Sequence, residues 1–406
     1  MRNLIFPIFI GLFDLFVFQA FLTLSADWSD GWSTVLYAAY WAVPLLAVFL
    51  ILRYASLGRA ADRQAWFVNA RTMVIGAYLS KFLIAMVLLV EDAGRLLWQL
   101  AGWLGLVESG AVERIPWISQ GAVLLAMSLF AVLVYGIFRN KYRYRLFRER
   151  IAIAGLPERL KGLRIVQISD IHSGSFTDPD RVREGVDLIN SQKPDLVFFT
   201  GDLVNNIARE MRGYINIFDK IEARYGVYSI LGNHDYGDYV RWPDSESKRQ
   251  NFQELLEVHR RMGWDLMLNE HRMLKIEGEE VAVIGVENYS AHGRFRSYGD
   301  LVKAYGGAEK AVLKLLLSHD PTHWEDQVLS DFPDIDVTFS GHTHGMQFGI
   351  EIPGWFRWSP AKYVYKQWAG LYQRGRQFLY VNRGFGFLGY PGRVGILPEV
   401  TLVELV

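Results

Sequence analysis

The first 140 residues contain four long apolar stretches, none of which carries the polar stripe of a helix on a soluble protein surface. They cover residues 4–24, 34–52, 72–90 and 117–138. Each has about 20 residues, the length that an α-helix needs to cross the hydrocarbon core of a bilayer. Buried helices of a soluble bundle are the alternative, but such helices show polar positions at a 3.6-residue period. The pattern therefore predicts a four-helix transmembrane region over residues 1–138.

Basic residues indicate how these helices are oriented. The loop between the second and third stretches is arginine-rich, with Arg53, Arg59, Arg63 and Arg71. The loops at 25–33 and 91–116 are mainly acidic, and the segment after the fourth stretch, residues 139–150, reads RNKYRYRLFRER. Short basic loops remain on the cytoplasmic side. We therefore expect an integral membrane protein, of the inner membrane if bacterial, with both termini and the C-terminal domain in the cytoplasm. A cleaved signal peptide is the alternative for the first stretch, but that run is long and Asp14 interrupts it.

Two charged residues fall near the centres of predicted spans. Asp14 lies in the first stretch and Lys81 in the third. With both helices running in the same direction, the two side chains are expected at similar depth, where an ionisable group needs a partner or water. Either they pair directly, or Lys81 extends toward the membrane surface while Asp14 is protonated or faces another chain. The sequence leaves both alternatives open.

From residue 164 the pattern changes to short apolar runs that alternate with amphipathic stretches, which is typical of α/β domains. Strands are expected at 164–169, 195–200, 227–231, 281–286, 314–318 and 336–340. Between the first two, Asp178 is placed to cap a helix that has Pro179 at its first position. The resulting division is a transmembrane region at 1–138, a basic cytoplasmic linker at 139–160 and an α/β domain at 161–406.

Polar clusters follow five of these strands directly. They read SDIH at 169–172, GD at 201–202, GNHD at 232–235, SHD at 318–320 and GHTH at 341–344. The carboxyl ends of strands in open sheets are where ligands bind, and two neighbouring divalent ions need about seven hard or borderline ligands with a shared carboxylate. The chain has no cysteine, so thiolate sites and thiol nucleophiles are excluded. The candidate metal ligands are Asp170, His172, Asp202, Asn233, His319, His342 and His344.

The ordered series D-x-H, GD, GNHD, SHDP and GHTH resembles the calcineurin-like metallophosphoesterases over residues 160–406. The tail VNRGFGFLGYPGRVGILPEVTLVEL is similar to the bacterial membrane-associated branch of that family. The resemblance implies two packed β-sheets flanked by helices, and two divalent metal ions, which are manganese, iron or zinc. It assigns Asp170, His172, Asp202 and His344 to one ion. It assigns Asp202, Asn233, His319 and His342 to the other.

The resemblance also implies catalytic residues outside the ligand set. His234 would stabilise charge on a phosphoryl oxygen or protonate the leaving group. Asp235 would either orient His234 or serve as a structural turn residue. Met346 stands where the membrane-associated branch usually has glycine, so the backbone near the site is expected to differ there.

Other features admit two interpretations. His259, His271 and His323 lie outside the polar clusters and are expected to be ordinary surface residues. The segment 287–296 is either a solvated loop or presents His292, Arg294 and Arg296 to an anionic substrate. The aromatic segment 352–372 is either a membrane-interface surface or a packed sheet edge. Because acidic and basic residues are equal at 43 each and no nucleic-acid module is present, nucleic acid is not an expected partner.

These observations predict a membrane-anchored phosphoesterase whose partners are the lipid bilayer and a phosphate-containing substrate. A lipid-linked phosphate ester or pyrophosphate at the cytoplasmic face is favoured, because tethering raises the concentration of the site near lipid headgroups. Soluble nucleotides or phosphoproteins are the alternative substrates. A transporter or sensor with a non-catalytic metal domain is the alternative class, and the oligomeric state is left open.

Overall fold

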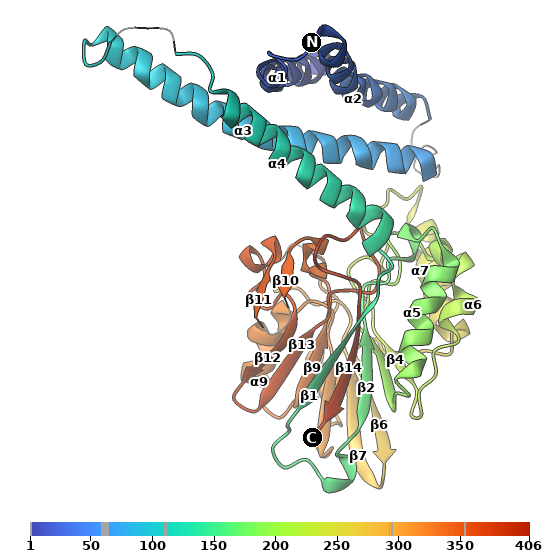
Figure 1. Cartoon of the computed structure of the whole chain (residues 1–406). Coiled ribbons are helices and arrows are strands. Elements are labelled where there is room, and N and C mark those ends of the chain that lie inside the picture. Colours follow the sequence, from blue (N-terminus) through green and yellow to red (C-terminus); the bar gives the residue numbers. More distant parts are fainter. Residues whose placement is uncertain are drawn as a thin grey trace. The chain divides into compact units, whose positions relative to one another are not determined.

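The computed structural model describes residues 2–57, 65–108, 110, 112–291, 293, 295–352 and 355–406, with side chains from residue 8 onward and, after the first gap, from residue 66. The chain forms two compact units, Met1–Tyr135 and Gly136–Val406, which Figure 1 shows as a helical part and a part built on sheets. Four residues used in the sequence-based predictions lie outside the described residues: Arg59, Arg63, His292 and Arg294.

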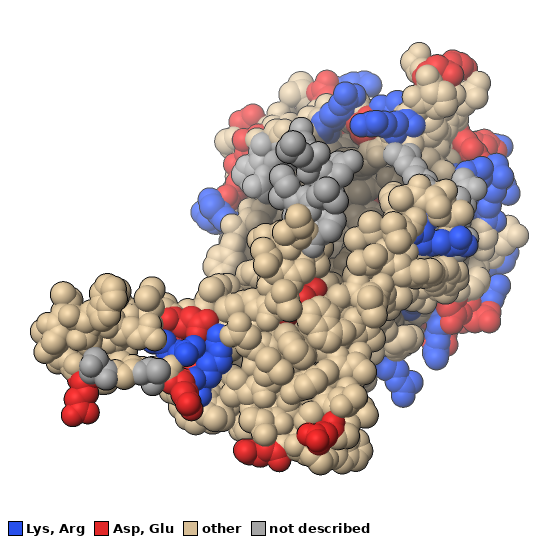
Figure 2. Space-filling view, turned by 90° about the horizontal axis from the view of Figure 1, so that it is seen from above, with Lys and Arg blue, Asp and Glu red and all other residues tan. Residues whose placement is uncertain are grey.

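The first unit consists of four helices: α1 (Arg2–Leu24), α2 (Asp30–Leu57), α3 (Ala65–Trp103) and α4 (Pro116–Tyr135). Within the described residues, three helices are long and apolar enough to cross a membrane, and α1 adds a shorter apolar stretch, Ile8–Leu24. The four predicted stretches all fall within these helices or their direct continuation. Their surface carries large apolar side chains, such as Leu45, Val90 and Leu124. Figure 2 accordingly shows a broad region with few charged side chains.

Helix α3 continues well beyond the predicted end of its apolar stretch at residue 90. Its next turn contains Glu91 and Asp92, which the sequence placed in a loop. The guanidinium group of Arg114 lies 3.2 Å from a Glu91 carboxylate oxygen and 2.7 Å from one of Asp92. Because these ion pairs neutralise the two carboxylates, the helix can continue through them.

Asp14 and Lys81 form a direct pair, which settles the alternative left open above. The Lys81 Nζ atom lies 2.7 Å from Oδ1 of Asp14, and Asp14 is 1% exposed. The hydroxyl of Tyr78 donates to Oδ2 of Asp14 at 2.8 Å, and that of Tyr40 donates to the Asp14 backbone carbonyl at 2.6 Å. The ammonium group also lies 3.9 Å from the ring centre of Tyr40. The charges therefore satisfy each other inside the helical unit.

This pair predicts a non-additive mutant cycle. We expect Asp14→Leu or Lys81→Leu alone to destabilise the protein by about 3 kcal/mol, because each strands one charge in an apolar environment. The double variant should lose less than either single variant, since no unpaired charge remains. Melting temperatures of the three variants in one detergent measure the effect. Additive losses would show that the two residues do not stabilise each other.

The second unit contains two six-stranded sheets and a small hairpin. The first sheet has the order β1-β14-β2-β3-β4-β5 and the second the order β12-β13-β9-β8-β7-β6. The first comprises β1 (Arg145–Ile151), β14 (Glu399–Leu405), β2 (Arg164–Ile168), β3 (Leu196–Phe199), β4 (Val227–Ser229) and β5 (Asp265–Leu266). The second comprises β12 (Gly370–Arg374), β13 (Gln377–Val381), β9 (Val337–Ser340), β8 (Leu313–Leu317), β7 (Glu279–Gly285) and β6 (Glu270–Ile276). The hairpin pairs β10 (Ile350–Ile352) with β11 (Phe356–Trp358).

The main core lies between the two sheets, where Phe198 of β3 packs against Phe339 of β9. Helices cover the outer faces of both sheets (Figure 1). They are α5 (Pro179–Ser191), α6 (Ile215–Phe218) and α7 (Ser245–Arg261) on the first sheet, and α8 (Leu301–Tyr305) and α9 (Leu329–Asp331) on the second. The short helical turns are η2 (Gly136–Asn140), η3 (Glu158–Leu160), η4 (Ser173–Ser175), η5 (Ala208–Gly213), η6 (Trp324–Val328), η7 (His344–Gln347) and η8 (Pro360–Tyr363). As predicted, Asp178 caps α5 by accepting from two of its backbone amides.

The range 139–160, in which the sequence predicts a linker, contains a strand of the first sheet. β1 pairs in parallel with β14 from Arg145 opposite Glu399 to Ile151 opposite Leu405. The sequence RLFRERI looks like a solvated charge run. An edge strand tolerates such a run, because Arg148 and Arg150 stay exposed while Leu146 and Ile151 pack on the two cores.

Candidate metal centre

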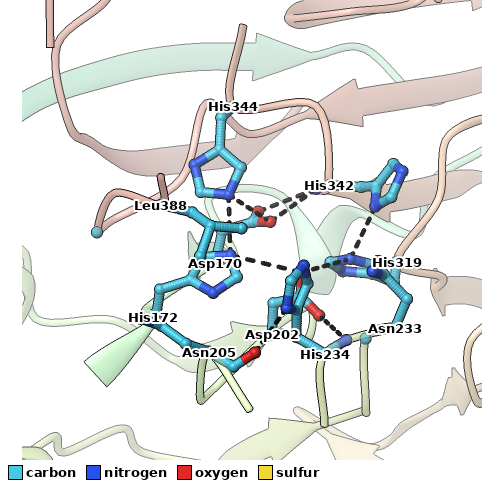
Figure 3. Close-up of polar contacts among 12 residues, drawn as sticks. Asp170, His172, Asp202, Asn205, Asn233, His234, His319, His342, His344 and Leu388 are labelled. Carbon is cyan, nitrogen blue, oxygen red and sulfur yellow. Dashed lines mark hydrogen bonds and ion pairs between the residues drawn. The ribbon is translucent and has the colours of Figure 1, made fainter. Parts of the chain in front are cut away.

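The seven predicted ligands all follow the carboxyl ends of strands in the two sheets, and Figure 3 shows them converging. Asp170 and His172 come after β2, and the loops after β3 and β4 add one ligand each. The second sheet contributes His319 after β8 and two histidines after β9. The ligands after β3, β4 and β9 are Asp202, Asn233, His342 and His344.

One group of donors consists of Asp170, His172 and His344, whose ligand atoms lie within 4.8 Å of one another. The Nε2 atoms of the two histidines are 3.0 Å apart, and that of His344 lies 3.3 Å from Oδ1 of Asp170. Two imidazole nitrogens that face each other at this distance beside a carboxylate form a donor set suited to a divalent cation.

A second group consists of Asp202, His319 and His342. Nε2 of His319 lies 3.2 Å from Oδ2 of Asp202 and 3.2 Å from Nδ1 of His342. The same Oδ2 atom lies 3.5 Å from Nε2 of His172, a member of the first group. One carboxylate oxygen of Asp202 therefore faces both groups, as a bridging ligand would.

Asn233 provides an independent test of whether these residues suit a metal ion. Its side-chain amide donates to the Tyr239 hydroxyl at 2.8 Å, which leaves the oxygen Oδ1 free of that interaction. This buried oxygen has no hydrogen-bond partner among the described residues. Buried polar atoms are rarely left unsatisfied. A cation bound beside Asp202 would satisfy it, so the donor set fits a metal centre.

The backbone at the ligands is held in an uncommon conformation. Asp170, His172, Asp202, His342 and His344 have φ angles of 52°, 46°, 61°, 71° and 50°. Non-glycine residues rarely adopt this left-handed region, at a cost on the order of 1 kcal/mol each. Tertiary hydrogen bonds hold it, as where the Asp170 amide donates to the Gly201 carbonyl at 2.9 Å. Strain concentrated at the candidate ligands is typical of a functional site.

Comparisons with known proteins agree with this geometry. The family described as "Calcineurin-like phosphoesterase" matches residues 163–346, and that described as "Probable Calcineurin-like phosphoesterase, transmembrane domain" matches residues 1–141. The chain is 30% identical over 254 residues to the metallophosphoesterase YkuE of Bacillus subtilis, covering 62% of this chain and 81% of that protein. The chain belongs to the calcineurin-like metallophosphoesterase family. The predicted family and fold class are thereby confirmed.

Two further relatives are named for a membrane location and for an enzymatic activity. A transmembrane protein with a metallophosphoesterase domain from Danio rerio is 30% identical over 305 residues, which cover 73% of this chain and 65% of that protein. The UDP-2,3-diacylglucosamine pyrophosphatase LpxG of Chlamydia muridarum is 27% identical over 277 residues, covering 56% of this chain and 79% of that protein. Like the first of these, the present metallophosphoesterase is an integral membrane protein.

Backbone carbonyls set the orientation of two candidate ligand imidazoles in the metallophosphoesterase. Nδ1 of His319 contacts the Thr200 carbonyl at 2.7 Å, and Nδ1 of His172 contacts the Val204 carbonyl at 3.2 Å. A carbonyl only accepts, so each Nδ1 carries a proton and each Nε2 faces the centre. His342 is reversed, because its Nε2 contacts the Tyr365 hydroxyl at 2.9 Å and its Nδ1 faces inward.

Burial and the two aspartates give these histidines different proton affinities. Burial lowers the pKa of His172 to about 3. Burial also acts to lower the pKa of His319, but the charge and hydrogen bond of Asp202 prevail and raise it to about 10. The pKa of Asp202 is lowered despite its burial, because His319 and His234 stabilise the carboxylate. Before a metal binds, His319 therefore carries a second proton, on Nε2 beside Asp202.

We expect metal binding to release this proton. His319 binds a metal only after losing it, so the affinity should rise with pH up to about 10, where the proton is lost without the metal. Titration calorimetry with Mn²⁺ at pH 7 in two buffers of different ionisation enthalpy measures the number of protons released. A heat that is the same in both buffers would contradict this assignment.

His234 lies beside the centre without belonging to either donor group. Its ring centre is 4.9 Å from that of His172, and its backbone amide donates to Oδ1 of Asp202 at 2.8 Å. Nδ1 contacts the Asn205 backbone carbonyl at 2.7 Å. That contact places the proton on Nδ1 and leaves Nε2 available, and Figure 3 shows His234 beside Asp202. No sequence motif indicated Asn205, because a backbone carbonyl contributes here rather than its side chain.

Asp235 does not have the orienting role that the sequence offered for it. Its carboxylate accepts from the backbone amides of Asp202, Leu203 and Gly232, each at 2.9 Å. Burial, with the nearby charge of Asp202, raises its pKa to about 7. Asp235 is therefore the turn residue of the second alternative, and it fixes the two loops that carry Asp202 and Asn233.

The expectation that His259 and His323 are surface residues is wrong. Both are fully buried, and their Nδ1 atoms contact serine hydroxyls, Ser229 at 3.0 Å and Ser318 at 2.8 Å respectively. Burial lowers the pKa of both imidazoles, so each is a neutral core residue. His271 is partly buried, with Nδ1 at 3.0 Å from the Ala304 carbonyl.

The segment 287–296 borders the metal centre through a residue that the sequence did not single out. The ring of Phe295 meets that of His342 edge-on, with 4.8 Å between ring centres. Arg296, one of the candidate anion-binding residues, instead lies 3.7 Å from a carboxylate oxygen of Asp238. The described part of this segment therefore contributes an aromatic wall beside His342.

Proposed function

We propose that this metallophosphoesterase hydrolyses a phosphate ester or pyrophosphate of a lipid-linked substrate, and that its catalytic domain faces the cytoplasm. The position of Asp202 supports hydrolysis most directly. Its Oδ2 atom lies 3.2 Å from Nε2 of His319 and 3.5 Å from Nε2 of His172. A carboxylate shared between two donor groups suits a pair of divalent ions, and paired ions serve in-line displacement at phosphorus.

When bound, the two ions supply an activated water and neutralise charge on the phosphoryl group. We assign one ion to Asp170, His172 and His344, the other to Asn233, His319 and His342, and the bridge to Asp202. His234 acts beside them, because the Asn205 carbonyl fixes its Nδ1 proton and Nε2 is directed to the substrate. From there a protonated Nε2 donates a hydrogen bond to a phosphoryl oxygen, or a proton to the departing oxygen.

The lipid-linked substrate class is supported by the membrane domain and by one relative. The four helices tether the catalytic domain to the membrane, which favours a lipid-linked substrate, whereas a soluble substrate gains little from such tethering. The relative LpxG is named for a pyrophosphatase activity on a diacylated nucleotide sugar.

The cytoplasmic orientation is supported by Arg53, Arg71 and the basic segment 139–150. Reaction of a cysteine placed at Asp30 with an external, impermeant reagent in intact cells tests the orientation.

The proposal is tested with the full chain in lipid nanodiscs, loaded separately with manganese, iron and zinc. UDP-2,3-diacylglucosamine represents lipid-linked pyrophosphates, and a soluble nucleotide diester represents the alternative. We expect the lipid-linked compound to have a kcat/KM at least about tenfold higher, a difference of roughly 1.4 kcal/mol in transition-state stabilisation. Preference for the soluble diester would refute the substrate class. No hydrolysis of either, with both metals bound, would refute the hydrolase assignment.

A further inference from the structure

The end of the last apolar helix makes close contacts within the second unit. The span Pro116–Asn140 ends in the turn η2, which belongs to that unit. The Arg393 amide donates to the Gly136 carbonyl at 3.2 Å, and the Asn140 side chain donates to the Arg393 carbonyl at 3.1 Å. A Cβ atom at Gly136 would lie 2.8 Å from the Arg393 carbonyl oxygen. This face of the second unit therefore lies at the point where the chain leaves its last span.

The same segment joins η2 to a metal-ligand loop. Immediately after Arg393, the amide of Val394 donates to the Gln347 carbonyl at 2.8 Å, and the Gly349 amide donates to the Val394 carbonyl at 2.9 Å. Gln347 ends the turn η7, which begins at the ligand His344. Gly349 directly precedes β10 of the small hairpin. The end of the span, the ligand His344 and the hairpin are thus linked through residues 393–394.

The hairpin and the turns on either side of it expose large apolar side chains. In the rest of the described second unit, outside η2, large exposed apolar side chains occur singly, at Tyr239, Met273, Val302 and Val312. Around the hairpin, exposed apolar side chains form a cluster, and the same segment carries exposed basic side chains. The apolar members, called the hairpin patch below, are Met346, Ile350, Ile352, Trp355, Phe356 and Tyr363. The exposed basic residues of the same segment are Arg357, Lys362 and Lys366, of which Lys366 is paired with Glu325 at 3.0 Å.

We propose that the hairpin patch rests in the headgroup region of the bilayer and thereby places the metal centre at the membrane surface. Tryptophan and tyrosine favour the membrane interface, and lysine and arginine bind the anionic headgroups around them. Apolar patches on a soluble surface are uncommon unless something covers them. Here the bilayer is the cover that fits, because η2 ends a membrane span on the same face.

The position of Met346 connects this surface to catalysis. Met346 and the candidate ligand His344 share η7, and the Met346 side chain is 43% exposed. A lipid whose headgroup carries the scissile phosphate would then reach the centre without leaving the bilayer. This consequence for the substrate rests on the proposed function, whereas the membrane contact itself does not.

Single cysteines test the membrane contact, because the chain has none of its own. Phe356 and Val312 are both 47% exposed. Phe356 belongs to the hairpin patch, whereas Val312 precedes β8 at the opposite end of that strand from the candidate ligand His319. Full-length Phe356→Cys and Val312→Cys are labelled with a fluorophore and reconstituted in vesicles containing phosphatidylglycerol. We expect nitroxide lipids to quench the label at 356 several-fold more than the label at 312, and iodide to do the opposite.

Equal quenching of the two labels by iodide would refute the membrane contact. Hydrolysis of UDP-2,3-diacylglucosamine in the same vesicles separates this outcome from failure of the proposed function. A shielded label at position 356 without lipid hydrolysis by the unsubstituted chain supports the contact and refutes the substrate. As a second variant pair, Ile352→Asp should lower the ratio of lipid to soluble-diester hydrolysis about tenfold, whereas Val312→Asp should leave that ratio unchanged.

Discussion

Asp202→Asn should lower kcat by about 10⁴-fold, which corresponds to roughly 5 kcal/mol of lost transition-state stabilisation. The carboxylate has one oxygen facing both donor groups, and its other oxygen accepts from the His234 amide at 2.8 Å. An amide nitrogen in place of either oxygen removes a charge that both ions share, or breaks the contact that holds His234. The variant should also retain at least one metal equivalent fewer than the parent, as measured by elemental analysis of the purified protein.

Asp187→Asn is the matched control for this variant, since Asp187 is exposed on α5 and makes the same change of charge. It should keep both its metal and its activity. A fully metal-loaded Asp202→Asn protein with kcat within a factor of ten of the parent would show that Asp202 does not bridge the ions.

His234→Ala should lose about 10³-fold in kcat, near 4 kcal/mol, while its metal content stays at the parental level. The imidazole belongs to neither donor group, and its Nδ1 is held by the Asn205 carbonyl at 2.7 Å. Removing it takes away a hydrogen-bond or proton donor to the phosphoryl group. The ligand atoms themselves remain in place.

Comparing substrates separates the two roles offered for His234. If it protonates the departing oxygen, esters with acidic leaving groups should lose less rate than esters of alkyl alcohols. His271→Ala is the control, because that histidine contacts the Ala304 carbonyl away from the centre. Loss of an ion from His234→Ala, to the extent seen in a ligand variant, would place His234 among the metal ligands.

The positions of the candidate ligands in the fold were predictable because each motif directly follows a short apolar strand. Within each sheet these strands are parallel, so the carboxyl ends of β2, β3 and β4 bring Asp170, Asp202 and Asn233 together, and those of β8 and β9 do the same for His319 and His342. The roles of the ligands' neighbours were not predictable. Asp235 and Asn205 act on or through backbone atoms, and the sequence does not reveal which amide or carbonyl the fold brings within reach.

Burial of polar side chains was the other feature that the sequence did not reveal. His259 lies in the run EVHRR, which looks solvated, yet it contacts Ser229 of β4 and packs beside Trp264. Its helix turns it onto the sheet while Arg260 stays in solvent. For Lys81 and Asp14, the sequence indicated burial but not the partner. Their depth could be estimated from helix length, but their pairing depends on which helices are neighbours, and no local pattern encodes that.

The order of the first sheet has a consequence for how the protein is made. β14 lies between β1 and β2, so β1, which follows the last membrane helix, has no strand beside it until residues 399–405 have left the ribosome. About 250 residues are synthesised in that interval, while the preceding helices are already entering the membrane. An unpaired strand offers free amides and carbonyls to other chains. During this interval the arginines of β1 serve as protection, because their like charges discourage a second nascent copy from pairing there first.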